Sequence, residues 1–483
     1  MSVIQVRGLT PLKGEIFIQG SKNAVLPMMA AALLHKGITV LTNVPVIRDV
    51  ACMEDILEHL GCGCCREGNC LIIDARQLTD THIPSEYVTA MRSSIVVLSV
   101  LLGRMGEGSS CYPGGCLIGA RPIDLHLMVL SKLGARLKEK DGLIEAALKD
   151  GEGLKGTEIF LPYPSVGATE QAILGSVLAK GVTDIHGAAR EPEIGQLCRF
   201  LNNMGAVVCG MGTDHIVVQG VEELHDSNFC VEGDRIVAGT YGAAVLAAQG
   251  TVTLKGVCPL DLKSPMEMLV RAGAYVRSRE ASREIEVTME RRPLGLGIET
   301  GPYPGFPTDL QSPFMAFLAA GAGRSVIEEK VFEERFGTVD SLKQMGASIC
   351  AQGQCAVIEG VYPLKGATVH ASDLRGGAAL TVAALAAEGT TTIRDCHHIE
   401  RGYEDICRDL AELGADIRCG KRTSGPYLSA YRTVGRSRQS RIGSCQRLHS
   451  DDGCQKLYGL QRYIEYRVDL GTSAICQPVR CQL

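Results

Sequence analysis

The tetrapeptide Lys132-Leu133-Gly134-Ala135 closes a periodic apolar stretch and leads into a β-prone run. Glycine reaches the left-handed backbone conformation at which many helices end, so this tetrapeptide predicts a helix end followed by a strand. The pattern recurs six times, with 68 to 73 residues between successive glycines. A period of this kind predicts six structural units of roughly 70 residues. The glycines concerned are Gly61, Gly134, Gly205, Gly273, Gly346 and Gly414.

Helices rich in small apolar residues form a second recurring element, as in residues 30–34, 173–179 and 383–387. Because these segments are apolar nearly all round, they are predicted to lie inside an α/β fold with sheets packed around them. Each unit is predicted to contain a strand, a buried helix, a strand, an exposed helix and a strand. Six units divide naturally into two domains of three, joined at the polar residues 226–228. A uniform solenoid is the alternative, but the repeats lack the sharp consensus of solenoid proteins.

The composition is that of an ordinary globular protein, with 45% hydrophobic and 21% charged residues among 483. A net charge of −5 argues against general nucleic-acid binding. The chain has neither a signal-peptide pattern nor the ~18 consecutive apolar residues of a membrane-spanning helix, so a soluble cytoplasmic protein is expected.

The 20 cysteines are scattered through apolar segments, which favours free thiols in a reducing compartment over a disulfide framework. Four of them cluster in the sequence, at Cys62, Cys64, Cys65 and Cys70. This group lacks a second ligand pair at zinc-site spacing, so incidental cysteines in a turn and a strand are favoured over a metal site.

Several cations stand where apolar helices begin or units end. Lys22, in Gly20-Ser21-Lys22-Asn23-Ala24, opens the first alanine-rich helix. A lysine opposes the helix dipole at this position, whereas an anion would be attracted, so an anion site is favoured over simple capping by Ser21. Any one arginine in such a place could form an ordinary surface ion pair. Several converging on one cleft would indicate a polyanionic substrate, and the candidates are Arg92, Arg121, Arg375 and Arg401.

Two carboxylates stand in similar positions, Asp309 and Asp373, each at the start of an apolar helix. The simpler interpretation is helix capping, which aspartate commonly provides. Nearby cations would also keep such a carboxylate ionised and available as a base.

A glycine-rich loop, residues 113–122, places Cys116 among three glycines and five residues before Arg121. Glycines allow the segment to bend, and a neighbouring cation lowers the pKa of a thiol. A hairpin turn with an incidental buried cysteine is the alternative interpretation.

Together, these motifs resemble the UDP-N-acetylglucosamine 1-carboxyvinyltransferases, which are enolpyruvyl transferases of the EPSP synthase family. The resemblance runs from the amino terminus to about Cys419. The segments that carry it are Ser21-Lys22-Asn23-Ala24, the loop from Pro113 to Asp124, Ser165-Val166-Gly167-Ala168-Thr169, Arg190-Glu191-Pro192-Glu193-Ile194, Phe306-Pro307-Thr308-Asp309, Phe332-Glu333 with Arg335-Phe336, Asp373-Leu374-Arg375 and Arg401-Gly402-Tyr403.

The resemblance implies two inside-out, barrel-like α/β domains, each of three repeated units. Residues 21–229 would form the domain with the cysteine loop, and residues 1–20 plus 230–419 the second domain. Residues 420–483, rich in arginine, have no counterpart in the family. They are expected to form a separate basic extension, either poorly ordered or docked as one small element.

The resemblance also implies transfer of the enolpyruvyl group of phosphoenolpyruvate to the 3′-hydroxyl of UDP-N-acetylglucosamine, with release of phosphate. No metal, cofactor, nucleic acid, membrane or obligate protein partner is implied. Cys116 would protonate the methylene carbon, and Asp309 would be the base. Phosphoenolpyruvate would be held by Lys22, Asn23, Arg121 and Arg401. The nucleotide sugar would contact Arg92, Arg121, Pro122, Ile123, Asp124, Leu125, Ser165, Val166, Gly167, Asp309 and Val331, with Arg335, Asp373 and Arg375 in support.

Three alternatives remain at this point. A shikimate-type enolpyruvyl transferase would share the fold and the donor, but would be expected to lack the Gly-Gly-Cys loop. An RNA 3′-phosphate cyclase would need a nucleotidylated histidine, and none of the 11 histidines lies in a convincing motif. A repeat scaffold for protein partners would present apolar faces rather than cations at the unit ends.

Overall fold

The computed structural model describes residues 3–114, 119, 122–149 and 152–420. The predicted residues Cys116 and Arg121, and the extension beyond Gly420, therefore lie outside the described residues. Within the described part, the buried apolar residues form two separate clusters. One runs from Ala24 to Val231, and the other combines Ile4–Ile18 with residues 236–417.

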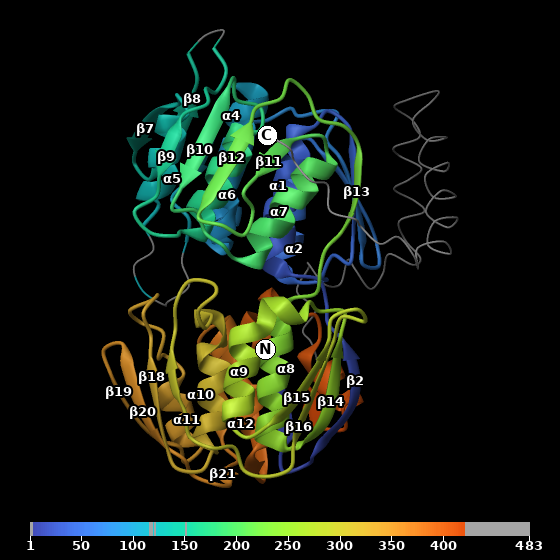
Figure 1. Ribbon diagram of the computed structural model, residues 1–483, viewed down its shortest axis with the longest axis vertical. Coiled ribbons are helices and arrows are strands. Elements are labelled where there is room, and N and C mark those ends of the chain that lie inside the picture. The colour runs from blue at the N-terminus through green and yellow to red at the C-terminus, as the bar shows by residue number, and fades with distance from the viewer. Residues whose placement is uncertain (1–2, 115–118, 120–121, 150–151, 421–483) are drawn as a thin grey trace. The chain divides into compact units, whose positions relative to one another are not determined.

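The first cluster is enclosed by three sheets (Figure 1). Their strand orders are β13(Ser227–Cys230)-β3(Ile38–Thr42)-β5(Cys70–Asp74)-β4(Gly63–Glu67), β6(Glu107–Cys111)-β8(Leu143–Ala147)-β7(Arg136–Lys140) and β11(Val207–Cys209)-β12(His215–Gln219)-β10(Val182–His186)-β9(Glu158–Phe160).

The second cluster has three sheets of its own. Their orders are β15(Tyr275–Arg279)-β16(Glu284–Met289)-β14(Gly250–Lys255)-β2(Leu12–Phe17), β17(Gly297–Glu299)-β18(Arg324–Glu328)-β20(Cys355–Glu359)-β19(Ser348–Gln352) and β22(Thr368–His370)-β24(Thr390–Arg394)-β1(Ile4–Arg7)-β25(Asp416–Cys419). The short strands β21(Leu364–Lys365) and β23(Ala387–Glu388) pair separately.

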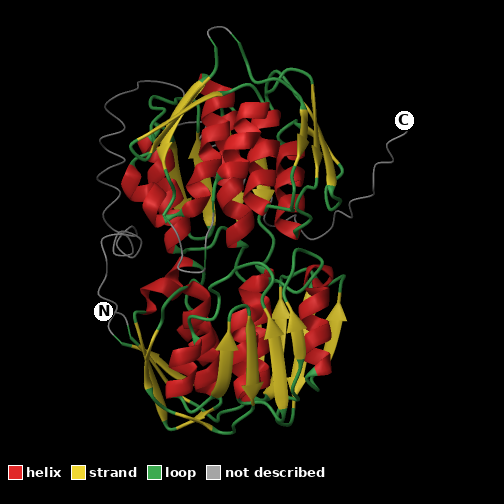
Figure 2. Cartoon of the chain, turned by 90° about the vertical axis from the view of Figure 1, so that its left-hand side faces the viewer, coloured by secondary structure: helices red, strands yellow, loops and turns green. Residues whose placement is uncertain are grey.

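Small-residue helices fill the space inside each set of sheets, as Figures 1 and 2 show. Every residue of α8(Arg235–Ala248) and α12(Leu374–Leu385) is buried, because alanine and glycine let the helices approach closely. These two helices pack on each other and on α10(Gln311–Ala319). In the first cluster the inner helices are α1(Lys22–Ala31), α4(Val97–Met105) and α6(Val166–Ser176). The predicted fold class, with buried helices and outer sheets, is confirmed.

The remaining helices end the units as the sequence pattern predicts. All six repeat glycines have positive φ angles, between 84° and 104°, which only glycine adopts without strain. Six helices lead into these glycines, one for each, and a further short helix, α3, precedes α4. Their bounds are α2(Arg48–His59), α3(Ser85–Ala90), α5(Asp124–Lys132), α7(Pro192–Asn203), α9(Lys263–Arg271), α11(Val339–Gln344) and α13(Ile406–Glu412).

The prediction of a single strand after the outer helix is wrong for most units. A complete unit ends in an antiparallel hairpin, as β11 and β12 show, because two strands are needed to cover the inner helices. The sixth unit ends with β25 alone. The amino-terminal strand β1 takes the missing place, pairing antiparallel with both β24 and β25.

Each cluster contributes one strand to a sheet of the other cluster. β2 precedes α1 but pairs in parallel with β14, whereas β13 precedes α8 but pairs in parallel with β3. Residues 227 and 228 therefore belong to a sheet, and their predicted role as the connection is wrong. The neighbouring Asp226 accepts a hydrogen bond from the Ile38 amide at 2.7 Å, and the Ser227 hydroxyl donates to Asn203 Oδ1.

The two connecting segments lie antiparallel to each other. The Ser21 amide donates to the Glu232 carbonyl, and the Asp234 amide donates to the Gln19 carbonyl, both at 2.8 Å. Gly20 faces Gly233 in this pairing. A β-carbon at Gly20 would lie 1.8 Å from the carbonyl oxygen of Asn43, so no larger residue fits without movement of the backbone.

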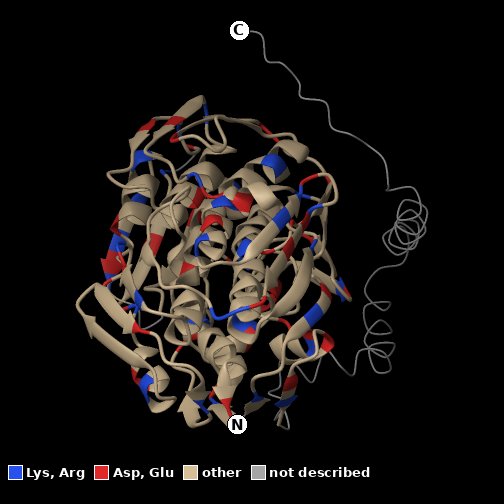
Figure 3. Ribbon diagram, turned by 60° about the horizontal axis from the view of Figure 1, so that its bottom comes forward, with Lys and Arg blue, Asp and Glu red and all other residues tan. Residues whose placement is uncertain are grey.

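Charged residues of both signs are intermingled along the ribbon, without a face of one sign in this view (Figure 3). The longest described helix, α8, has 14 residues. No helix among those described has the length and apolarity required to cross a membrane.

We predict that Gly20→Ala lowers the thermal unfolding midpoint by roughly 4–8 °C, because overpacking against a backbone carbonyl costs about 2 kcal/mol. Differential scanning calorimetry measures the change. Gly63→Ala is the matched control, since a β-carbon there meets its nearest atom at an ordinary 3.5 Å. Equal midpoints for the two variants would contradict the close approach at Gly20.

Candidate active site

Lys22, Asp49 and Arg401 form a buried ion-pair cluster. Lys22 is the first residue of α1, Asp49 lies in the first turn of α2, and Arg401 ends the 3₁₀ helix Cys396–Arg401. The Lys22 ammonium lies 2.6 Å from Asp49 Oδ2, and Arg401 Nε lies 2.9 Å from Asp49 Oδ1. The Asp49 side chain is only 5% exposed. One carboxylate thus holds two cations that are far apart in the sequence.

The electrostatics of this cluster favour an anionic ligand. Burial disfavours the ionised form of Asp49, but the charges of Lys22 and Arg401 and their hydrogen bonds outweigh it and lower the pKa of this carboxyl. With Asp49 ionised, the three side chains carry a net charge of about +1. The predicted residue Asn23 follows Lys22 in the same helical turn and is half-buried.

Asp234 links this cluster to the starts of two inner helices. Its Oδ1 accepts hydrogen bonds from the amides of Ile236 and Val237 at 2.8 and 3.1 Å, which caps α8. Its Oδ2 accepts from the Lys22 amide at 3.1 Å, which holds the first residue of α1. The same side chain therefore positions the lysine and the first turn of a helix in the other cluster.

Asp309 also bridges two cations. It lies in the 3₁₀ helix Thr308–Leu310, and its two carboxylate oxygens accept hydrogen bonds from Arg335 at 2.6 Å and Arg375 at 2.7 Å. Burial disfavours the charge on Asp309. The guanidinium groups of Arg375 and Arg335, with Lys22 contributing, hold the pKa of this carboxyl well below its usual range. Asp309 is therefore ionised at neutral pH, and Lys22 lies near enough to act on it.

The two predicted carboxylates have different roles in the structure. Asp373 caps α12, since its Oδ1 accepts from the amides of Arg375 at 2.9 Å and Gly376 at 3.0 Å. The capping alternative is thus correct for Asp373. By orienting the first turn of α12, Asp373 sets the direction from which Arg375 reaches Asp309.

Glu329, which the sequence analysis did not single out, organises the segment around Val331. It is fully buried and accepts hydrogen bonds from the hydroxyls of Thr300 and Thr308 at 2.8 and 2.9 Å. It also accepts from the Val331 amide at 2.9 Å. Glu329 therefore ties the residue before Asp309 to the predicted ligand-contacting residue Val331.

Several residues predicted to bind the nucleotide sugar surround one pocket of about 490 Å³. Arg92, Pro122, Ile123 and Asp124 line it, and Arg92 donates to the Pro122 carbonyl at 2.9 Å. None of the described residues that line this pocket is Lys22, Asp309 or Arg401.

The predicted segment Ser165–Gly167 begins α6. Ser165 caps this helix by accepting from the Ala168 amide at 3.4 Å, and Val166 is its first residue. A β-carbon at Gly167 would lie 2.7 Å from the ring of His126, so glycine permits this close approach. Of the remaining predicted contacts, Leu125 is buried and Val331 is partly exposed.

A second buried group of carboxylates was not predicted. Glu193, in α7, lies 2.9 Å from Arg235, the first residue of α8, and Glu191 accepts from the Tyr303 amide at 3.2 Å. Glu170 lies inside, on α6. Burial and the charges of Glu193 and Glu191 raise the pKa of Glu170 to about 8. Glutamates in helices are common in sequences, so no pattern distinguishes Glu170 from a surface residue.

We predict that Glu170→Gln raises the thermal unfolding midpoint more at pH 8 than at pH 5. In the unfolded chain Glu170 ionises near its ordinary pKa of about 4.3, whereas the folded protein keeps it protonated up to about pH 8. Between these values the folded state binds more protons, so wild-type stability falls as pH rises, and glutamine removes this term. Glu67→Gln, at an exposed position, is the control. A pH-independent difference would contradict a neutral Glu170.

Comparison with known proteins identifies the family. A family model described as EPSP synthase (3-phosphoshikimate 1-carboxyvinyltransferase) matches residues 6–410. The UDP-N-acetylglucosamine 1-carboxyvinyltransferase 2 of Caldanaerobacter subterraneus subsp. tengcongensis is 43% identical, over 86% of this chain and 99% of the relative. The UDP-N-acetylglucosamine 1-carboxyvinyltransferase of Finegoldia magna is 44% identical, over 86% of this chain and 98% of the relative.

Among solved structures, the enolpyruvyl transferase NikO from Streptomyces tendae superposes with a TM-score of 0.78. It is 24% identical and covers 87% of this chain and 99% of its own, which establishes the fold. The identities above 40% over nearly whole relatives establish more than the fold. The chain belongs to the EPSP synthase family and, within it, to the UDP-N-acetylglucosamine 1-carboxyvinyltransferases.

Proposed function

We propose that this protein transfers the enolpyruvyl group of phosphoenolpyruvate to the 3′-hydroxyl of UDP-N-acetylglucosamine and releases phosphate, the first committed step of peptidoglycan synthesis. The observation that carries the proposal is the near-complete match to relatives of that name at 43–44% identity. The charge of the site supports it. Phosphoenolpyruvate brings about three negative charges, and two clusters of two cations around one carboxylate attract such an anion.

In this proposal Lys22 and Arg401 bind phosphoenolpyruvate, with Asn23 beside them. Asp49 holds both cations within 3 Å of its carboxylate, so the anion meets a site whose charges are already in position. Cys116 and Arg121 lie outside the described residues, and their roles as proton donor and anion ligand rest on the motif alone.

The reaction proceeds by addition and elimination. The Cys116 thiol gives its proton to the methylene carbon while the sugar oxygen bonds to the neighbouring carbon, and Asp309 takes the hydroxyl proton. The methyl group then gives a proton back to the Cys116 thiolate, which restores the double bond, and Asp309 returns its proton to the phosphate as it leaves. Because two arginines hold Asp309 ionised, it is a weak base. A weak base suffices if proton transfer follows formation of the C–O bond, when the attacking oxygen is strongly acidic.

The pocket lined by Arg92, Pro122, Ile123 and Asp124 is the proposed place of the nucleotide sugar, together with Leu125, Ser165, Val166, Gly167 and Val331. Residues 21–229 and residues 1–20 plus 230–419 are the proposed domains, a division supported by the two hydrophobic clusters. The described cysteines are all free thiols, which supports a cytoplasmic location.

We predict that the purified protein releases phosphate from phosphoenolpyruvate only when UDP-N-acetylglucosamine is added. A coupled colorimetric phosphate assay measures the rate, and mass spectrometry identifies the enolpyruvyl ether. Shikimate 3-phosphate is the comparison acceptor, because the matching family model also describes a shikimate-type enzyme. Equal release with shikimate 3-phosphate, or none with either acceptor, would overturn the assignment.

We predict that Asp49→Asn lowers kcat/KM for phosphoenolpyruvate by at least about tenfold, since an amide neither neutralises nor holds both cations. Steady-state kinetics with varied phosphoenolpyruvate measure this ratio. Asp80→Asn is the control, because the Asp80 side chain is half-exposed and its ion pair, 3.6 Å from His59, lies at the surface. An unchanged kcat/KM in Asp49→Asn would show that Lys22 and Arg401 keep their positions without the Asp49 carboxylate.

A further inference from the structure

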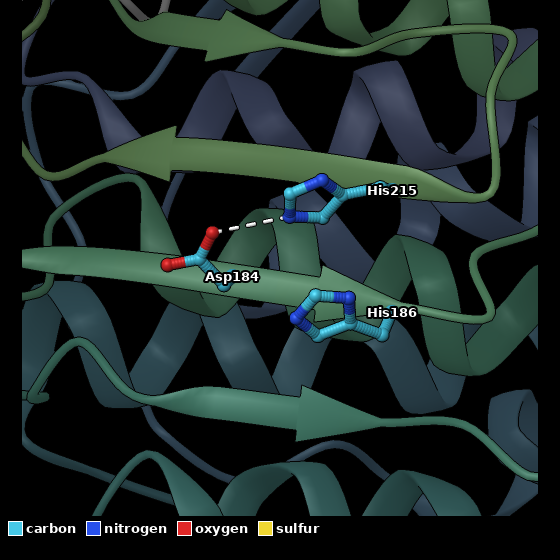
Figure 4. Close-up of side chains that lie close together, drawn as sticks. All are labelled: Asp184, His186 and His215. Carbon is cyan, nitrogen blue, oxygen red and sulfur yellow. Dashed lines mark hydrogen bonds and ion pairs between the residues drawn. The ribbon is translucent and has the colours of Figure 1, made fainter.

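A group of three potential metal ligands lies on the outer face of the sheet β11-β12-β10-β9 (Figure 4). Asp184 and His186 are two residues apart on β10, so both side chains point to the same side of the sheet. His215, on the neighbouring strand β12, is the direct register partner of His186. The group shares no residue with the candidate active site.

The three side chains are already close. His215 Nε2 lies 3.1 Å from Asp184 Oδ1. The rings of His186 and His215 are stacked, with centroids 4.4 Å apart and planes 7° apart. Phe160, on β9, stacks on the other face of His186 at 4.7 Å. One ligand atom from each of Asp184, His186 and His215 lies within 4.8 Å of the other two.

These distances can be compared with a zinc site. In a tetrahedral site with bonds of 2.0–2.1 Å, ligand atoms lie about 3.3 Å apart. Asp184 and His215 already have this separation. His186 completes the triangle if the two imidazole rings tilt out of their parallel stack, so that a nitrogen lone pair of each points at the ion, a side-chain movement that leaves the strands in place. His186 is half-buried and His215 exposed, so an ion can reach them from solvent.

We propose that Asp184, His186 and His215 bind a divalent transition-metal ion, Zn²⁺ in the first instance, with the fourth position open to water. Two imidazoles and one carboxylate are a donor set that zinc accepts. Glu158, the register partner of Asp184 on β9, adds a negative charge on the same face. A bound ion would join β10 to β12 and stabilise this sheet.

The test must resolve individual histidines, because thiolates are also zinc ligands and the chain has 20 cysteines. The full-length protein is treated with diethyl pyrocarbonate with and without a few equivalents of Zn²⁺, and modified histidines are located by peptide mass mapping. We expect zinc to lower the modification rate of His186 and His215 at least about fivefold. His370, paired with Asp395 at 2.7 Å on another sheet, is the internal control and should react equally in both samples.

Three variants complete the experiment. Asp184→Asn should abolish zinc protection of His186 and His215, whereas His370→Ala should leave it unchanged. Competition with a chromophoric zinc chelator should show one high-affinity equivalent fewer in His215→Ala than in the wild-type protein. Equal reactivity with and without zinc, protection that persists in Asp184→Asn, or protection only at millimolar zinc would overturn the proposal and leave an ordinary surface ion pair.

Discussion

A buried carboxylate must be paired, and Asp49 is paired with two cations at once. Lys22 begins one inner helix and Arg401 ends a 3₁₀ helix more than 350 residues later, yet both lie within 3 Å of the same side chain. Leaving Asp49 unpaired would cost several kcal/mol, so the pairing fixes where both cations lie. The burial of Asp49 therefore determines where the two cations of the proposed anion site lie.

Asp309 repeats this arrangement with Arg335 and Arg375. Each group has two cations on one ionised carboxylate, so each has a net charge of about +1 and fixed geometry. Fixed charges of this kind need no rearrangement when a charged substrate arrives, which is the main electrostatic advantage of a protein site over water. The supporting carboxylates Asp234, Asp373 and Glu329 set the backbone from which these groups project.

Sequence patterns predicted the features that depend on local structure. The repeat glycines mark helix ends because their φ angles require glycine, and the small-residue helices are buried because they are apolar all round. The exchange of β2 and β13 between clusters was not predictable from the residues themselves, since a strand pattern does not identify the pairing partner and the polar start of β13 resembled a connection. The same limit applies to the site. Lys22 and Arg375 stood out as cations at helix starts, whereas Asp49 and Glu329 carry no local signal, because their importance comes from residues distant in the chain.

The position of β1 has a consequence for synthesis of the protein. Ile4 pairs with Ile393 on one side and Cys419 on the other, so the first described strand needs the last two described strands as partners. At roughly 5–20 residues per second, translation keeps this strand waiting for about 20–80 s. During that time β1 has no partner strand, and an unpaired strand presents free N–H and C=O groups that can pair with another chain. The first cluster is complete once β13 has been synthesised, whereas the second cluster still waits for β24 and β25, so the nascent chain carries one complete core and one incomplete core.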